Sequence, residues 1–228
     1  VVWLAEVARH RERVESLGGR VLRGQLSGAV GTMAALGEKG PEVKRRTVAK
    51  LGLGASPEPW HTARDNIAET ASCFAMIATT LAKIANEIIL LGRTELGELR
   101  EPTVGRTTAG SSTMPHKRNP VLCQRVVVLS SHVRGLLSIV MDAMIHENER
   151  DPRSLWSEWL AMPQIAIYTG TALHSMTHIL ADLEVYPDQM LMNLHLQKEA
   201  VTSEWLRFRL AKPLGKMQAQ ALLKRAME

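Results

Sequence analysis

The stretch CFAMIATTLAKIANEIILL, residues 73–91, decides the fold class of this chain. Its apolar side chains recur alternately three and four positions apart, at Phe74, Ile77, Leu81, Ile84, Ile88 and Leu91. This spacing places them in one stripe along an α-helix. Such a stripe packs knobs-into-holes against helices that run nearly parallel or antiparallel to it. The stretch therefore predicts one long helix of a helical bundle.

Two later segments repeat the spacing. One stripe comprises Val126, Leu129, Val133, Leu136 and Val140, and the other comprises Met162, Ala166, Thr169, Leu173, Met176, Leu180 and Leu183. The three stripes predict long helices over residues 62–94, 120–149 and 155–183. Strand signals are nearly absent. We therefore expect an all-α fold, a long antiparallel helical bundle.

Capping signals agree with these helices. Thr62 stands three positions before Asp65, as in a capping box. Asn119-Pro120 places a capping residue before a proline at the first helical position. Ser154 is expected to cap the third long helix.

Shorter helices flank the bundle. The pattern predicts a helix over residues 1–17 that Gly18-Gly19 breaks, and others over 41–51, 188–195, 202–211 and 214–227. The composition shifts after Tyr186-Pro187, which indicates two regions. We expect a central bundle at 1–185, with its N-terminal part missing because the chain begins as if in mid-helix. Residues 186–228 are the expected start of a C-terminal helical domain.

The amino-acid composition and the net charge restrict the classes of ligand that the protein is expected to bind. The chain has 228 residues, 45% hydrophobic and 22% charged, as in ordinary globular proteins. Its net charge of +5 favours acidic ligands, and on charge alone nucleic acid and small carboxylates fit equally well. Aromatic residues are only 4%, and no nucleic-acid-binding signature is found. A small carboxylate is therefore the expected ligand, rather than nucleic acid.

The two cysteines and the apolar residues 73–91 indicate the cellular compartment of the protein. Cys73 and Cys123 lie inside apolar helical patterns and predict reduced, buried thiols of a cytoplasmic protein. Lys83, Asn86 and Glu87 interrupt residues 73–91, which disfavours a membrane span. No cysteine or histidine spacing suits a metal, so the sequence predicts no metal site and no cofactor.

The run GSSTMPHKRNP, residues 110–120, carries the candidate chemistry. The residues before it, 103–110, are small or polar except Val104 and Arg106, so they predict a loop rather than core. A serine hydroxyl becomes basic only where donors stabilise its alkoxide, and Lys117 with nearby backbone amides could do so. The run thus suits proton transfer next to a carboxylate. A solvated linker between two helices is the structural alternative.

This run matches the GSSxMPxKxNP signature loop of the fumarase/aspartase superfamily at every fixed position. The resemblance implies that Ser111 is the catalytic base and that Lys117 and Asn119 bind the substrate carboxylate. Ser112 and Met114 would line the loop. It also implies homotetramers in which three subunits contribute to each active site.

Other segments resemble the adenylosuccinate lyase branch of this superfamily. They are Arg93-Thr94-Glu95, Glu101-Pro102 and residues 27–32, SGAVGT. Thr113 in the loop, residues 60–65 (WHTARD) and Glu158-Trp159 are similar to the 3-carboxy-cis,cis-muconate cycloisomerase family. That likeness implies lactonisation of a carboxymuconate in protocatechuate/β-ketoadipate catabolism. The alternatives are adenylosuccinate lyase or a related fumarate-releasing lyase and, from another class, a non-catalytic helical scaffold.

Three further residues are candidates for substrate binding. His61 precedes the first long helix, where capping and packing are the alternative role. Arg64 could contact a ligand or form a buried salt bridge, with Asp65 or Glu69 as partner. Arg150, at the end of the second predicted helix, could bind a carboxylate or complement the helix dipole.

Overall fold

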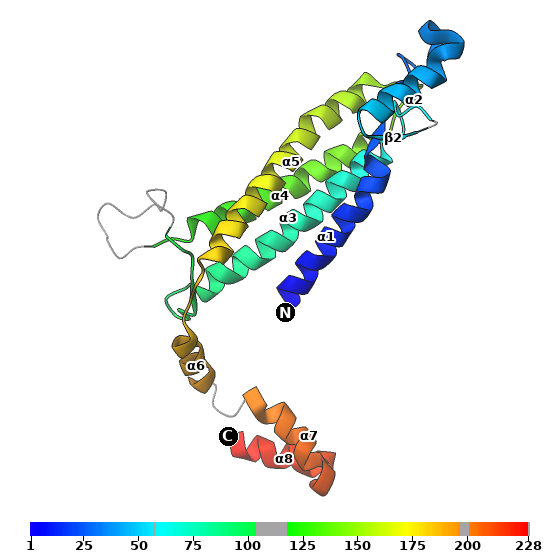
Figure 1. The fold of residues 1–228 in the computed structure, drawn as a ribbon. Helices are drawn as coiled ribbons and strands as arrows, with labels where there is room; N and C mark the ends of the chain where they lie inside the picture. Colours follow the sequence, from blue (N-terminus) through cyan, green and yellow to red (C-terminus); the bar gives the residue numbers. More distant parts are fainter. Residues whose placement is uncertain (57, 104–117, 197–200, 228) are drawn as a thin grey trace.

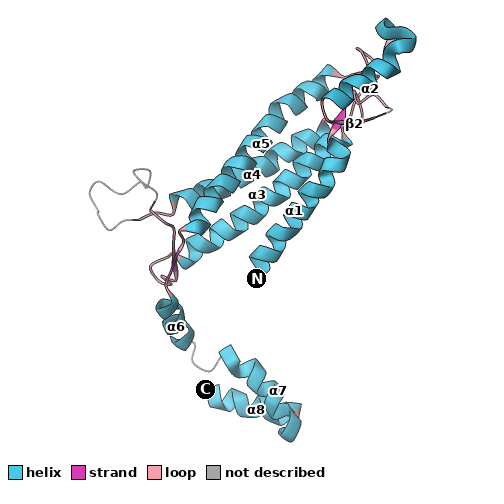
Figure 2. Cartoon of the chain, viewed as in Figure 1, coloured by secondary structure: helices cyan, strands magenta, loops and turns pink. Residues whose placement is uncertain are grey.

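The computed structural model describes residues 1–56, 58–103, 118–196 and 201–227, and most of the described residues are helical (Figure 2). Four long helices lie side by side (Figure 1). They are α1 (Val2–Val21), α3 (Asp65–Leu91), α4 (Val121–Asp142) and α5 (Pro152–Ala181). Successive members α3, α4 and α5 alternate in direction, so the predicted all-α antiparallel bundle is confirmed.

Short elements extend the two ends of the bundle. The 3-10 helix η1 (Ala34–Lys39) and α2 (Gly40–Lys50) lie at the end where α3 begins (Figure 1). At the opposite end follow α6 (Pro187–Leu196), α7 (Ser203–Leu214) and α8 (Lys216–Met227). Helices α7 and α8 pack on each other. The division into domains at residue 185 stays a prediction.

The strands of the described residues are only two residues long. β1 (Arg23–Gly24) pairs in parallel with β2 (Gly54–Ala55), and β3 (Leu99–Arg100) pairs antiparallel with β4 (Glu184–Val185). Each pair ties a loop to one end of the bundle rather than forming a sheet. The first pair holds the connection between α1 and α2 against the segment that leads to the candidate site.

Helix α3 forms the centre of the core. Its stripe residues Ile84 and Ile88 are each 1% exposed and pack in one cluster with Cys123 of α4 and Ile179 of α5. Further along, alanines of α3 let α4 and α5 approach closely, at Ala68, Ala71, Ala75 and Ala78. α3 is also the one described helix whose length and composition would suit a membrane span. Its contacts with α1, α4 and α5 account for that apolar composition.

The third predicted stripe is partly wrong. Leu173 and Leu180 of α5 are each 44% exposed, whereas Ile165, Ala172 and Ile179 are fully buried. α5 carries apolar residues on more than one face, so periodicity alone does not say which face meets α3 and α4. The first two stripes lie at the core as expected, with Ile84 and Ile88 of α3 and Val126 and Val133 of α4 buried.

Several helix boundaries differ from the predictions, most of all the C-terminal ends of α1 and α4. α1 continues through Gly18-Gly19 to Val21, because Leu17 and Val21 pack against the core. Each glycine disfavours a helix by about 1 kcal/mol, so the pair costs about 2 kcal/mol, which the burial of Leu17 and Val21 outweighs. α4 ends at Asp142 rather than at residue 149, and Asn148 in the following loop has a positive φ of 56°.

The three predicted caps are wrong. α3 begins after Arg64 without a side-chain cap. α5 is capped one turn earlier than expected, by Asp151, whose carboxylate accepts a hydrogen bond from the Arg153 amide at 2.9 Å. The Ser154 hydroxyl instead donates to the Ile145 carbonyl. At α4, Glu101 supplies the acceptor that was expected from Asn119.

Candidate active site

A pocket of about 280 Å³ lies at the end of the bundle where α3 and α5 begin. It brings together His61, Arg64 and Arg150, which the sequence proposed separately as substrate-binding residues. The remaining lining residues are Gln25, Gly28, Trp60, Leu155 and Trp159. The pocket therefore combines cations, an amide group and aromatic walls, a composition suited to an anion with a carbon skeleton.

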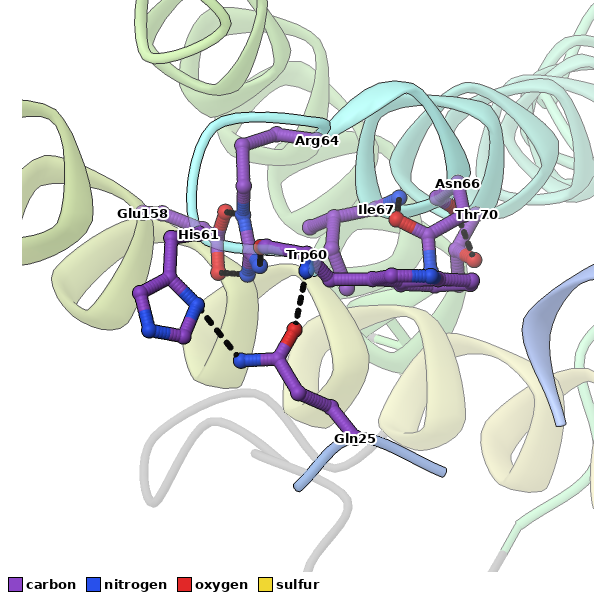
Figure 3. Close-up of polar contacts among 8 residues, drawn as sticks. All are labelled: Gln25, Trp60, His61, Arg64, Asn66, Ile67, Thr70 and Glu158. Carbon is purple, nitrogen blue, oxygen red and sulfur yellow. Dashed lines mark hydrogen bonds and ion pairs between the residues drawn. The ribbon is translucent and has the colours of Figure 1, made fainter. Parts of the chain in front are cut away.

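Arg64 forms a nearly buried ion pair with Glu158 of α5 (Figure 3). Its Nε and Nη2 atoms donate to the two carboxylate oxygens at 2.7 and 2.5 Å, and Nη1 donates to the Trp60 carbonyl at 2.7 Å. The side chains are 14% and 6% exposed. The partner is thus neither Asp65 nor Glu69, and Glu158 neutralises most of the charge that Arg64 would offer a ligand.

His61 is held by two hydrogen bonds. Its Nε2 lies 2.7 Å from the Gly28 carbonyl, which can only accept, so Nε2 carries the proton. Nδ1 therefore accepts from the side-chain amide of Gln25 at 2.8 Å, and the Gln25 oxygen accepts from the Trp60 backbone amide at 2.5 Å. These bonds join the segment that carries Gln25 and Gly28 to the segment that carries Trp60 and His61, and Figure 3 shows the two bonds of Gln25. They orient the imidazole ring at the wall of the pocket.

Arg150 is the remaining cation of the pocket. It lies in the loop between α4 and α5, not at a helix end as predicted. Its Nη1 is 3.5 Å from the Ala29 carbonyl, and among the described residues no carboxylate pairs with it. With Arg64 neutralised, Arg150 is the group in this pocket best placed to bind a substrate carboxylate.

The signature loop is only partly visible. Ser111, Ser112, Met114 and Lys117 lie outside the described residues. Asn119 is described, and it is exposed just before α4. α4 begins at the end of the bundle opposite to the starts of α3 and α5 (Figure 1), where the residues that line the pocket lie. Since the 27-residue helix α3 separates the ends by roughly 40 Å, one chain does not bring Asn119 to His61.

Sequence reasoning missed the roles of Gln25, which lines this pocket, and of Glu158, which pairs with a residue that lines it. Gln25 links His61 to the Trp60 backbone, and its only signal is a polar position just before the SGAVGT segment. The sequence of Glu158-Trp159 is similar to that of the cycloisomerase family, but this similarity did not identify Glu158 as the partner of Arg64. The two residues lie 94 positions apart, and only the packing of α5 beside α3 brings them together.

Comparisons with known proteins decide the family. A family model described as "Lyase" matches residues 1–135, more than half of the chain. The chain belongs to this lyase family. Its likeness to the fumarase/aspartase superfamily, and within it to muconate cycloisomerases, is thereby confirmed.

Several relatives of this lyase-family chain carry functional names. It is 40% identical, over 97% of its length and 49% of the relative, to N-acetyl-S-(2-succino)cysteine lyase of Dickeya dadantii. It is 38% identical, over 96% of its length and 48% of the relative, to 3-carboxy-cis,cis-muconate cycloisomerase of Pseudomonas aeruginosa. The chain spans about half the length of these relatives.

The fold of this lyase-family chain also matches a solved structure. The crystal structure of 3-carboxy-cis,cis-muconate lactonizing enzyme from Pseudomonas putida superimposes with a TM-score of 0.88 at 37% identity. The match covers 98% of this chain and 49% of that one. The described helices therefore have the arrangement found in a lyase-superfamily enzyme.

Proposed function

We propose that this chain is part of an enzyme that adds or eliminates a group across a C=C bond next to a carboxylate. The observation that carries the proposal is the meeting of His61, Arg64 and Arg150 in one pocket of a lyase-family fold. Our first candidate reaction is the lactonisation of 3-carboxy-cis,cis-muconate. The muconate cycloisomerase relatives and the solved lactonizing enzyme support it.

In this proposal Arg150 binds a substrate carboxylate at the pocket. Two groups form the walls around this carboxylate. One is Arg64, which pairs with Glu158, and the other is His61, which Gln25 holds in place. Trp159 is 56% exposed and offers an indole face to a conjugated diene. Charge is thereby fixed at one end of the substrate while its unsaturated carbons lie on apolar surface.

The signature loop supplies the proton transfer. One substrate carboxylate oxygen attacks the double bond and forms a C–O bond, and Ser111 delivers a proton to the neighbouring carbon, next to a second carboxylate. Lys117 and Asn119 bind that second carboxylate and stabilise the extra negative charge that it carries in the intermediate. In an elimination the same serine would act in reverse, as the base.

A second candidate reaction is favoured by the relative that is 40% identical, N-acetyl-S-(2-succino)cysteine lyase. For this chain it would mean that Ser111 removes a proton next to one succinyl carboxylate. The C–S bond then breaks, the thiolate leaves with the electron pair, and fumarate is released. The pocket serves this reaction equally, because both substrates place carboxylates beside the reacting carbons.

The proposal requires more than one chain. Asn119 and the pocket lie at opposite ends of the bundle, so a complete site needs the loop of a second copy. α5 offers apolar surface for such packing, since Trp156, Leu160 and Ile167 are 61%, 71% and 62% exposed. We therefore propose a homotetramer with shared active sites, as in the superfamily that the sequence resembles.

The experiment is a side-by-side assay of the full-length protein. Carboxymuconate, N-acetyl-S-(2-succino)cysteine and adenylosuccinate are offered at equal concentration, and turnover is followed by ultraviolet absorbance. We expect carboxymuconate to have the highest kcat/KM. A higher value for the succinyl thioether would select the second candidate. The absence of turnover on every substrate would favour the non-catalytic scaffold.

A further inference from the structure

A second hollow runs along the middle of the bundle, away from the pocket at its end. This groove, of about 510 Å³, lies between α1, α3 and α4. Arginines from two helices line it, Arg9 and Arg13 of α1 and Arg134 of α4, and Met76 of α3 and Leu137 of α4 add apolar surface. Its volume is within the usual range for small-molecule sites, about 300–1,000 Å³.

The three guanidinium groups of the groove are not neutralised. Arg13 Nη1 lies 3.3 Å from His10 Nδ1, and Arg134 donates to the Ser130 hydroxyl at 2.7 Å. Within the described ranges none of the three arginines pairs with a carboxylate. Three unpaired cations that face one hollow repel one another, and a bound anion would relieve that repulsion.

The one carboxylate of the groove, Glu6, is already engaged. It forms an ion pair with Lys83 and accepts a hydrogen bond from the Thr80 hydroxyl at 2.6 Å. Because Thr80 donates there, it accepts from His10 Nε2 at 2.8 Å, which leaves Nδ1 to face Arg13. His10 is therefore neutral, and burial, followed by the charge of Arg13, lowers its pKa. Neither Glu6 nor His10 therefore neutralises the positive charge of the three arginines.

Hydroxyl groups do not compete with the arginines as donors. The Ser72 and Thr79 hydroxyls donate to the carbonyls of Ala68 and Ala75 within α3. The N–H groups that face the groove are therefore mainly those of guanidinium groups, which bind carboxylate and phosphate oxygens in a bidentate manner. An adjoining hollow of about 360 Å³ shares Arg9 and Arg13, but Glu12 and Glu69 also line it, so the site is limited to the groove between α1, α3 and α4.

We propose that this groove binds a small polyanion with two or more carboxylate or phosphate groups. The arginines of α1 and α4 hold the charged groups from opposite sides, and Met76 and Leu137 accommodate the carbon skeleton between them. This site is separate from the pocket that contains Arg150, so its occupancy does not depend on the proposed reaction.

The test is isothermal titration of the full-length protein with inorganic pyrophosphate and with citrate. An Arg150→Gln background removes the cation of the other pocket. The groove variant adds Arg9→Gln and Arg134→Gln. The control adds Arg11→Gln and Arg125→Gln, which remove the same charge from α1 and α4. Arg11 lies about 200° around α1 from Arg9, and Arg125 about 180° around α4 from Arg134, so the control charges point away from the groove.

We expect the groove variant to bind both anions at least tenfold more weakly than the control. If the groove variant loses affinity for only one of the two anions, the groove binds ligands with the acid group of that anion, phosphate for pyrophosphate or carboxylate for citrate. Equal affinities in the two variants, or no binding to either, would overturn the proposal. A third outcome would also overturn the proposal: the anions do not bind, and the groove variant has a lower oligomer mass than the control. In that case an acidic segment of another copy occupies the groove. If the double variant does not fold, Arg134→Gln alone is compared with Arg125→Gln.

Discussion

Glu101 accepts a hydrogen bond from the backbone amide of Cys123 at 2.7 Å, across 22 positions of sequence. Its second carboxylate oxygen accepts from the Leu122 amide at 3.0 Å. The first amides of a helix lack intrahelical partners and favour a negative charge, so Glu101 is the N-terminal cap of α4. It also joins the two described flanks of the segment that carries Ser111.

We predict that Glu101→Gln lowers both thermal stability and turnover. A glutamine side chain has one carbonyl oxygen for two amides, and its NH₂ group would face a donor. The melting temperature should fall by several degrees, and kcat should fall because α4 begins directly after the signature loop. Glu95→Gln, at an exposed position before β3, is the matched control. An unchanged melting temperature, measured by calorimetry, would contradict this account of the cap.

The buried pair Arg64–Glu158 gives a second prediction. Removing one partner leaves a charge that is largely cut off from water, so Glu158→Gln should lower the free energy of unfolding by about 3 kcal/mol. The double variant Arg64→Met/Glu158→Leu should recover part of that loss. Urea unfolding measures both.

The exposed pair Arg20–Glu69 serves as control for the buried pair. Its side chains are 53% and 41% exposed, and such pairs contribute about 0–1 kcal/mol. Arg20→Gln should therefore change the free energy of unfolding far less than Glu158→Gln does. Equal losses in the two variants would mean that the Arg64–Glu158 pair is not sheltered from solvent in the full-length protein.

The cap of α5 predicts a pH dependence. Hydrogen bonds from the Arg153 side chain are the main cause that lowers the pKa of Asp151 from 3.8 to about 2. A carboxyl group with a lowered pKa stabilises the folded state above its unfolded pKa and loses that contribution as the pH falls through the folded one. Asp151→Asn should thus melt lower than wild type at pH 6, and the difference should shrink as the pH falls from about 4 toward 2.

Asp182→Asn, at the other end of α5, is the control for this cap. Its carboxylate lies at a helix C-terminus, where a negative charge does not help. The substitution should therefore not lower the melting temperature at pH 6. Melting curves of both variants from pH 6 to pH 3 make the comparison. A difference between Asp151→Asn and wild type that stays constant over this range would contradict the assignment.

The sequence predicts the helices well because their packing faces are periodic. The core positions Ile84, Ile88, Val126 and Val133 lie in stripes that need no long-range information. The residues that cap the helices cannot be predicted from the sequence in the same way. Glu101 reaches α4 from 21 residues away, and no local pattern marks so distant an acceptor. For the same reason local reasoning could not choose Glu158 as the partner of Arg64.

The candidate site was predictable one residue at a time but not as an arrangement. His61, Arg64 and Arg150 were each chosen by residue type and resemblance, and the structure brings them together. Their separation from Asn119 depends on the alternating helix directions and on the length of α3. A single sequence does not show that two halves of one site lie at opposite ends of the same bundle.

Ser111→Ala gives a fourth prediction, on a residue outside the described part of the chain. If the Ser111 hydroxyl transfers the proton, its loss should lower kcat by several orders of magnitude while the melting temperature stays unchanged. Ser112→Ala, one position later, controls for the loss of a loop hydroxyl and should have a smaller effect. Turnover near the wild-type rate in Ser111→Ala would remove this residue from the mechanism.

The separation of the pocket from the signature loop gives the last prediction. If each site combines the loop of one chain with the pocket of another, two inactive full-length variants should restore activity when their subunits are mixed. Ser111→Ala supplies intact pockets and Arg150→Gln supplies intact loops. After unfolding and refolding together, about one quarter of the sites should be intact by random assortment of subunits.

The control for mixing is a pair of variants in the same segment. Ser111→Ala mixed with Lys117→Ala leaves every loop with one defect, so no intact site can form and activity should stay at the level of the single variants. Light scattering of each mixture should give four times the chain mass. If Ser111→Ala and Arg150→Gln fail to restore activity although mixed tetramers form, both residues act within one chain. The loop would then have to reach its own pocket along the whole length of α3, and the shared-site proposal would be wrong.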